Sequence, residues 1–202
     1  AELYTTCDVS DLSAYGLGKA TNGGGVGATP SFTFVAGTAA AAGTFLYVSY
    51  EASNFAAFFG FAPTASGVGA LNVNGDDAVA LYHDNAIIDV FGETSVDGTG
   101  TAWEYTDGWA YRVARTTAFG GWATSHWSFS GKNALDTGCS TVAAASCSTP
   151  FPRATYVPPY SPPSPPPSPG LPLPPYAPPL LPPPLLPPPP LRATAPLSPL
   201  GA

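Results

Sequence analysis

Apolar and polar positions alternate in short stretches through the first part of the chain, and glycine-rich turns separate the stretches. The alternating stretches span residues 31–35, 44–50, 76–92, 108–115 and 126–130. In the clearest of them, Val79 and Leu81 alternate with small or polar neighbours. His83, Asp84 and Asn85 then supply a turn, and an apolar strand returns. The pattern predicts many short strands, with a hairpin over 76–92.

Helical periodicity is confined to residues 53–61, SNFAAFFGF, and covers barely two turns. Short strands at regular spacing predict an all-β fold, an immunoglobulin-like β-sandwich in particular. About 140 residues are enough for such a sandwich to bury a core of its own. Within it we expect structural roles for Trp103 and for the turn residues Gly75, Asp76 and Asp77.

Composition divides the chain. Of its 26 prolines, 24 lie from Pro150 onward, whereas all 13 acidic residues lie before residue 137. We therefore expect a β-sandwich over 1–137, a Cys-containing connector over 138–150 and a Pro-rich polyproline II rod over 151–202. With four basic residues, the first segment has a net charge of 4 − 13 = −9, while Arg153 and Arg192 give the remainder +2.

The acidic first segment lacks the basic surface that replaces phosphate counterions, which argues against a nucleic-acid partner. It also argues against binding to an anionic membrane surface. No apolar run approaches the roughly 20 residues that span a bilayer. The chain begins at Ala1 and contains no Met. This fits a removed secretory signal and predicts an extracellular, cell-wall or cell-surface protein.

Three cysteines, Cys7, Cys139 and Cys147, leave one without a partner inside the chain. Cys139–Cys147 would close a small local loop and is the favoured pairing. Cys7–Cys139 would instead join the two ends of the domain. No Cys/His spacing supports a zinc site, and we expect no cofactor.

Candidate chemistry in the first segment is weak. The acidic residues Asp76, Asp77, Asp84 and Asp89 lack the spacing of a calcium loop, and backbone capping by their side chains is the favoured interpretation. No G-x-S-x-G motif occurs and nothing selects a pair of carboxylates, so we expect no enzyme. Four tryptophans could stack on sugars, but at strand spacing they are more typical of a core.

Two segments together resemble a known family. NGDDAVALYHDNAIIDVFG, followed by DGTGTAWEY and WSFSGKNALD, is similar to the lamin-tail domain of secreted proteins. DLSAYGLGKATNGG before SFTF matches the preceding portion, so the resemblance covers roughly residues 2–137, with the opening strand abbreviated to AELYTTC. It implies an immunoglobulin-like β-sandwich and no particular activity.

The proline-rich segment 151–202 has a period of three. From Pro163 to Pro199, 11 of the 13 positions in one register are proline, against 4 of 12 in each other register. Polyproline II has three residues per turn, so one edge of the rod would be nearly pure proline. The other edges carry leucines that we expect to contact other subunits. These leucines are Leu171, Leu173, Leu180, Leu185, Leu186 and Leu191.

SPPSPPPSP, at 161–169, resembles the extensin-like and pherophorin-like hydroxyproline-rich glycoproteins of plant and green-algal matrices. The resemblance implies hydroxylated, glycosylated prolines and glycosylated serines. The candidates are Pro162, Pro163, Ser164, Pro165, Pro166, Pro167, Ser168, Pro169, Pro182, Pro183, Pro184, Pro187, Pro188, Pro189 and Pro190. The chain lacks N-x-[ST], so any sugar would be O-linked. A ligand for SH3- or WW-type domains is the alternative for a cytosolic protein.

These observations predict an extracellular structural glycoprotein, a subunit of a fibre, filament or wall layer. Its partners would be copies of itself, arranged head to tail, and covalently attached O-glycans. The alternative is an adhesive or carbohydrate-binding module on a glycosylated stalk.

Overall fold

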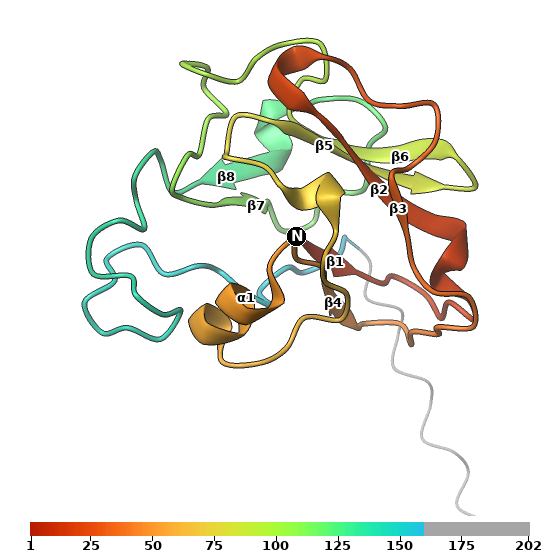
Figure 1. The fold of residues 1–202 in the computed structure, drawn as a ribbon, viewed down its shortest axis with the longest axis horizontal. Coiled ribbons are helices and arrows are strands. Elements are labelled where there is room, and N and C mark those ends of the chain that lie inside the picture. Colours follow the sequence, from red (N-terminus) through yellow and green to blue (C-terminus); the bar gives the residue numbers. More distant parts are fainter. Residues whose placement is uncertain (160–202) are drawn as a thin grey trace, which may run out of the picture. The chain divides into compact units, whose positions relative to one another are not determined.

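The computed structural model describes residues 1–159, which form a β-rich domain with little helix (Figure 1). The compact unit continues past residue 137. It therefore includes the connector 138–150 and the start of the proline-rich segment. The Pro-rich positions from 160 onward, and with them the polyproline II prediction, lie outside the described residues.

Antiparallel pairs build three sheets in this part of the chain. The strands are β1 (Glu2–Tyr4), β2 (Tyr15–Ala20), β3 (Phe32–Thr33), β4 (Phe45–Tyr47), β5 (Ala78–His83), β6 (Ala86–Phe91), β7 (Ala110–Arg112) and β8 (Trp127–Phe129). A four-stranded sheet has the order β3-β2-β5-β6, and β1-β4 and β7-β8 form two-stranded sheets. Each predicted strand is present, but most are shorter than the alternating stretch that predicted them. The coarse prediction of a β-rich fold is confirmed.

The predicted hairpin is the longest regular feature. β5 and β6 pair from Val79 opposite Phe91, with an irregularity between Leu81 and Tyr82. Asp84 and Asn85 at the turn have φ of 49° and 65°. Asn and Asp tolerate this left-handed conformation better than other side chains do, and it matches the twist of the flanking strands. The local sequence therefore fixes the hairpin.

The predicted helix is also present, as α1 (Ala52–Phe59). It ends at Gly60, whose φ of 82° is the left-handed C-terminal cap that glycine favours. None of its residues is buried. Phe55 and Phe59 pack instead with each other and with Phe61 in a half-buried aromatic group.

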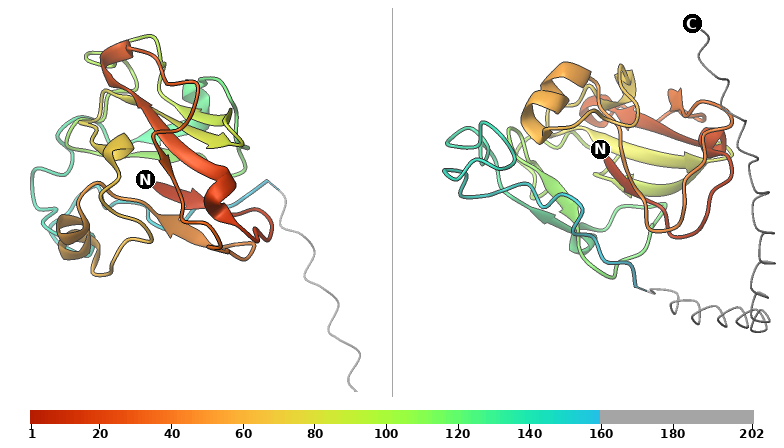
Figure 2. Two further views of the ribbon diagram at one scale, coloured as in Figure 1. Left: turned by 45° about the vertical axis from the view of Figure 1, so that its right-hand side comes forward. Right: turned by 90° about the horizontal axis from the view of Figure 1, so that it is seen from below.

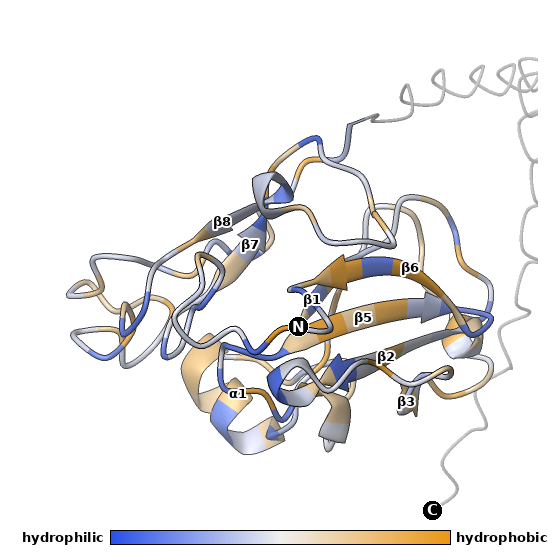
Figure 3. Ribbon diagram, turned by 90° about the horizontal axis from the view of Figure 1, so that it is seen from above, coloured by the Kyte–Doolittle hydropathy of each residue, from blue (hydrophilic) through white to orange (hydrophobic). Residues whose placement is uncertain are grey.

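The two faces of β5 are covered unequally. On one face Ala80 and Tyr82 are 0% exposed, and the Tyr82 hydroxyl donates to Gly27 O at 2.7 Å, under the loop that follows β2. On the other face Val79 and Leu81 are only partly buried, although they border the main core cluster. Figure 3 shows the apolar stretch of β5 between β2 and β6. The larger aliphatic side chains thus lie on the less protected face.

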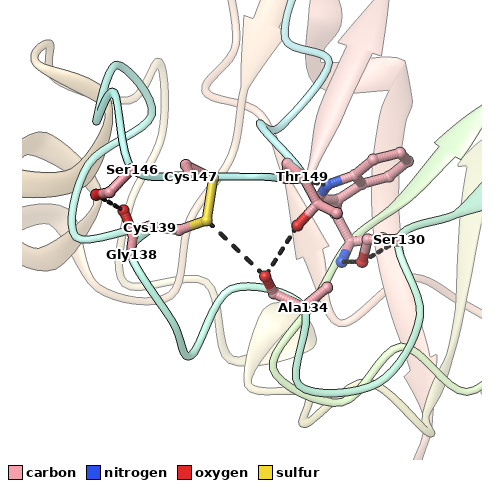
Figure 4. Close-up of a disulfide and its surroundings, with 8 residues drawn as sticks. Ser130, Ala134, Gly138, Cys139, Ser146, Cys147 and Thr149 are labelled. Carbon is pink, nitrogen blue, oxygen red and sulfur yellow. Dashed lines mark hydrogen bonds between the residues drawn. A yellow bond between two sulfur atoms is a disulfide. The ribbon is translucent and has the colours of Figure 1, made fainter.

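The favoured disulfide is confirmed. Cys139 and Cys147 are bonded, with Cα atoms 4.4 Å apart, and Cys7 is free and exposed. The loop that they close packs on the domain, since Val142 N donates to Phe58 O at 3.0 Å. Figure 4 shows the hydrogen bonds around it: Thr149 Oγ1 donates to Ala134 O at 2.9 Å. The alternative Cys7–Cys139 pairing is not formed.

Candidate functional site: an aromatic cleft

A hollow of about 360 Å³ lies between the less protected face of β5 and the strands β1 and β7. We call it the aromatic cleft. Its aliphatic wall includes Leu3, Leu17, Val79 and Leu81, and its aromatic wall includes Trp109, Tyr111, Trp127, Phe151 and Tyr156. Ligand sites in proteins usually measure about 300–1,000 Å³ and have mostly apolar walls with a few polar groups. The cleft has the size and lining of a binding site.

A second, smaller hollow of about 180 Å³ adjoins the first. Glu2, Leu71 and Phe151 line both, and the smaller one continues to Phe55 and Phe59 of α1. The two hollows together extend from β7 to the half-buried aromatic group on the helix. Figure 2 shows α1, the N-terminal strand and the β7-β8 pair along this side of the domain. An elongated apolar surface of this kind suits an extended occupant better than a compact one.

Two of the three charged side chains that line the cleft form an ion pair, and the third, Glu2, accepts hydrogen bonds from Tyr111 and Ala154. Arg112 Nη2 lies 2.6 Å from Asp89 Oδ1, with side chains 13% and 18% exposed. The Arg112 guanidinium also lies over the Trp127 ring, 4.4 Å from its centroid. Paired and largely buried, these groups present little free charge. The cleft is therefore suited to an uncharged occupant.

Tyr111 of β7 is the centre of a hydrogen-bond cluster beside the cleft. Its hydroxyl donates to Glu2 Oε1 at 2.5 Å and accepts from Thr155 N at 3.0 Å and Tyr156 N at 3.1 Å. Glu2 Oε2 accepts from Ala154 N at 2.9 Å. Burial raises the pKa of Tyr111, and the hydrogen bond to Glu2 adds to the rise. The phenol therefore stays protonated and keeps its donor at neutral pH.

The cluster holds residues 151–157, which we call the clamped segment. Phe151 packs edge-on against Trp109 and Tyr111, with centroids 6.3 and 6.2 Å apart. Further along, Arg115 N donates to Val157 O at 2.7 Å. The Tyr156 hydroxyl donates to Thr116 O at 2.6 Å. The first residues of the proline-rich segment thus pack on the domain and contribute Phe151 and Tyr156 to the cleft lining. They do not run as a straight polyproline II rod, because the chain turns at Arg153 and Ala154, where Ala154 has a φ of 56°. Sequence reasoning missed this role of Tyr111 and Glu2 because these residues are 109 positions apart.

Of the predicted structural residues, Gly75 lies in a tight turn with φ of 99°, where a Cβ would come within 2.5 Å of Thr106 N. Asp77 Oδ1 accepts from Asn22 N at 2.9 Å. Asp76 Oδ2 accepts from Thr99 Oγ1 at 2.8 Å, while its Oδ1 is buried with no hydrogen bond among the described groups. Asp77 thus caps a backbone amide as predicted, whereas Asp76 binds a side-chain hydroxyl and no backbone amide among the described residues.

The four aspartates of the candidate calcium cluster are not all brought together. Asp89 pairs with Arg112, and Asp84 lies exposed beside His83, with the nearest nitrogen and oxygen atoms 3.7 Å apart. Within residues 1–159 no three His, Cys, Asp or Glu side chains are grouped to hold a metal ion. Nor does this part of the chain contain a helix long and apolar enough to cross a membrane.

The tryptophans differ in their surroundings. Trp103 is 4% exposed and packs against Phe91, as expected of a core residue. Trp109, Trp122 and Trp127 are half-buried. Trp109 and Trp127 line the cleft, and Trp109 Nε1 donates to Thr149 O at 3.0 Å. The four do not form one exposed platform.

A separate ion pair, between Glu104 and Lys132, lies near the Gly75 turn, since Tyr105 N donates to Gly75 O. Glu104 Oε1 lies 2.6 Å from Lys132 Nζ, and Gly100 N donates to Glu104 Oε2 at 2.8 Å. The Lys132 hydrogen bond, together with those from Gly100 and Thr106, lowers the pKa of Glu104 to about 2. This carboxylate organises its own loop at residues 100–106 and joins it to Lys132 beyond β8.

The predicted glycosylation positions and the predicted leucine contacts all fall between 162 and 191, outside the described residues. Comparisons with family models, curated proteins and solved structures found no match. The fold and the disulfide define the coarse class: a β-rich domain with one local disulfide and an aromatic cleft, continued by a proline-rich segment.

Proposed function

We propose that the chain is an extracellular structural glycoprotein, a subunit of a fibre, filament or wall layer. Its β-rich domain would be an immunoglobulin-like sandwich of the lamin-tail kind. The proline-rich rod would carry O-glycans and run along neighbouring subunits. The domain and the rod would thus be the two halves of a repeating contact.

The observation that carries this proposal is the division of the sequence. Proline occupies 11 of 13 positions in one three-residue register, and leucines fill positions between. A free spacer needs glycine and serine rather than leucine. Exposed leucines on a stiff rod form apolar patches that a partner surface would cover. The aromatic cleft, on the same chain, offers such a surface.

Two further features support an extracellular role. The Cys139–Cys147 disulfide is typical of an oxidising compartment. Low charge, with 9% charged residues in the whole chain, is in keeping with a matrix protein that works in a dense assembly. Neither feature selects an activity, which agrees with a structural role.

Electron microscopy of protein isolated from its source, with mass spectrometry of peptides from 160–202, tests the proposal. We expect filaments and pentose-bearing hydroxyproline. A monodisperse monomer with unmodified prolines would contradict it. Truncation tests the rod separately, and the cut belongs after Pro159, because the clamped segment packs on the domain. Normal assembly of the truncated chain would reduce the rod to a spacer.

The carbohydrate-binding alternative has one observation in its favour, the half-buried indoles of Trp109 and Trp127 in the cleft. It predicts a monomer that binds glycans through these two side chains. Glycan-array binding by a chain that forms no filaments would favour it over the structural role.

A further inference from the structure

The face of β5 that borders the aromatic cleft is incompletely covered. On the opposite face of the strand Ala78 and Ala80 are 1% and 0% exposed, whereas the larger Val79 and Leu81, which alternate with them, are only partly buried. Folded domains normally bury the large aliphatic face of a central strand, because apolar area is removed from water there. A hollow of about 360 Å³ beside these side chains indicates that another group completes the layer.

The lining of the cleft specifies the chemistry of that group. Trp109, Tyr111 and Trp127 provide aromatic rings. Asp89 pairs with Arg112, and the Glu2 carboxylate accepts hydrogen bonds from Tyr111 and Ala154, so each charged side chain in the lining already has a partner. Grooves lined with Trp and Tyr are the surfaces on which extended proline-rich segments dock. The cleft thus matches an uncharged proline-rich peptide.

The domain already holds a proline-containing segment of its own chain beside the cleft. Residues 151–157 of the same chain lie along the aromatic wall. Their amides reach the Tyr111 hydroxyl, and their backbone accepts from Arg115 N. The clamped segment contributes Phe151 and Tyr156 to the lining, and the hollow beside them also borders Val79 and Leu81 of β5. This hollow is the space available to an extended peptide.

Resting on the proposed function, we propose that the aromatic cleft binds residues 171–181 of a second copy of this chain. This stretch, LPLPPYAPPLL, is uncharged and contains four leucines and one tyrosine. It also lies between the predicted glycosylation clusters at 162–169 and 182–190, so no predicted sugar has to enter the cleft.

The composition of the chain between Pro159 and Leu171 favours a second copy as the occupant. Six of the eleven intervening residues are proline. Proline-rich sequence of this kind is extended and stiff, with a rise of about 3.1 Å per residue. In the polyproline II form expected from the sequence, the twelve steps from Pro159 to Leu171 would span roughly 35 Å without folding back, which favours the cleft of a second copy.

The test uses the full-length chain and a fluorescein-labelled peptide of residues 170–181, GLPLPPYAPPLL, with unmodified prolines. Anisotropy measures binding. Val79→Phe fills the cleft from β5, and Ala110→Leu fills it from β7, because both residues line it. Val35→Phe is the matched control, because Val35 is 78% exposed and lies outside the cleft lining. Thermal unfolding checks that each variant is folded.

We expect saturable binding to the unmodified chain and to Val35→Phe, and binding at least about tenfold weaker to the two cleft variants. A peptide with its four leucines replaced by serine should also bind at least about tenfold more weakly. No binding at about 1 mM, or unchanged binding by folded cleft variants, overturns the proposal. A last variant has serine in place of its own four leucines, Leu171, Leu173, Leu180 and Leu181. If the peptide binds only to this variant, the chain's own segment normally occupies the cleft, and the proposal that a second copy occupies it is overturned.

Electron microscopy of the same variants separates this contact from the proposed structural role. Filaments from Val35→Phe but not from Val79→Phe support both. Equal filaments from both variants leave the structural role intact and overturn the cleft contact. Peptide binding by an unmodified chain that never forms filaments, even from native material, would overturn the structural role alone.

Discussion

Removing the Tyr111 hydroxyl is the sharpest test of how the domain holds the clamped segment. Tyr111→Phe keeps the ring, which is 9% exposed, and deletes only the oxygen. That oxygen donates to the Glu2 carboxylate and accepts two backbone amides, from Thr155 and Tyr156. The change therefore leaves one acceptor and two donors without their partner.

The magnitude follows from these three bonds. A hydrogen bond to a charged group contributes about 1.5–3 kcal/mol and a neutral one about 0.5–1.5 kcal/mol. Water can reach the half-exposed amides and recover part of the loss. We therefore expect Tyr111→Phe to lower the free energy of unfolding by about 2–4 kcal/mol.

Urea unfolding followed by tryptophan fluorescence measures this loss. Amide exchange of a peptide covering 151–157 should accelerate in the same variant. Tyr50→Phe is the matched control, because Tyr50 is 44% exposed and its hydroxyl has no hydrogen bond among the described residues. Its effect should stay within about 0.5 kcal/mol. Equal stability of the two variants, with unchanged exchange over 151–157, would refute the role given to Tyr111.

Three further predictions concern other parts of the domain. Gly75→Ala should destabilise it by at least about 2 kcal/mol more than Gly37→Ala in urea unfolding, because both have positive φ but only Gly75 has backbone within 3 Å of the new Cβ. The pKa of Glu104 is lowered from 4.5 to about 2 in the folded state, so its stabilisation is present above pH 4.5 and is lost as the pH falls toward 2. Glu104→Gln should flatten the fall of Tm over that interval, and an equally steep fall would contradict the ion pair. Iodoacetamide should label Cys7 alone in the native, non-reduced protein, as checked by peptide mass spectrometry, and a labelled second cysteine would contradict the disulfide.

Features set by neighbouring residues were predictable from the sequence. The β5-β6 hairpin follows from alternation and from the turn at Asp84 and Asn85, whose side chains tolerate positive φ. The helix predicted over 53–61 is present, although it ends at Phe59, before the Gly60 that the prediction had included. The disulfide closes a short loop, and the bonded cysteines are eight positions apart. Each depends on a few contiguous residues.

The aromatic cleft was not predictable in this way. Alternation marked Val79 and Leu81 as one face of a strand, but it carries no information on whether an opposing layer covers them. That depends on where β1 and β7 lie, and the Glu2–Tyr111 contact joins residues 109 positions apart. The sequence likewise marked four tryptophans, and only their packing separates Trp103 in the core from Trp109 beside the cleft.

The clamped segment also determines how the domain would carry mechanical load. A tension applied through the proline-rich rod enters the domain at 151–157 and passes to Tyr111 on β7 and Glu2 on β1. The force is thus shared between β1 and β7, which lie near the beginning and near the end of the domain's sequence. Resistance to such a pull is set by the unfolding rate rather than by equilibrium stability. The residues that hold 151–157 would then set the force at which the domain begins to unfold.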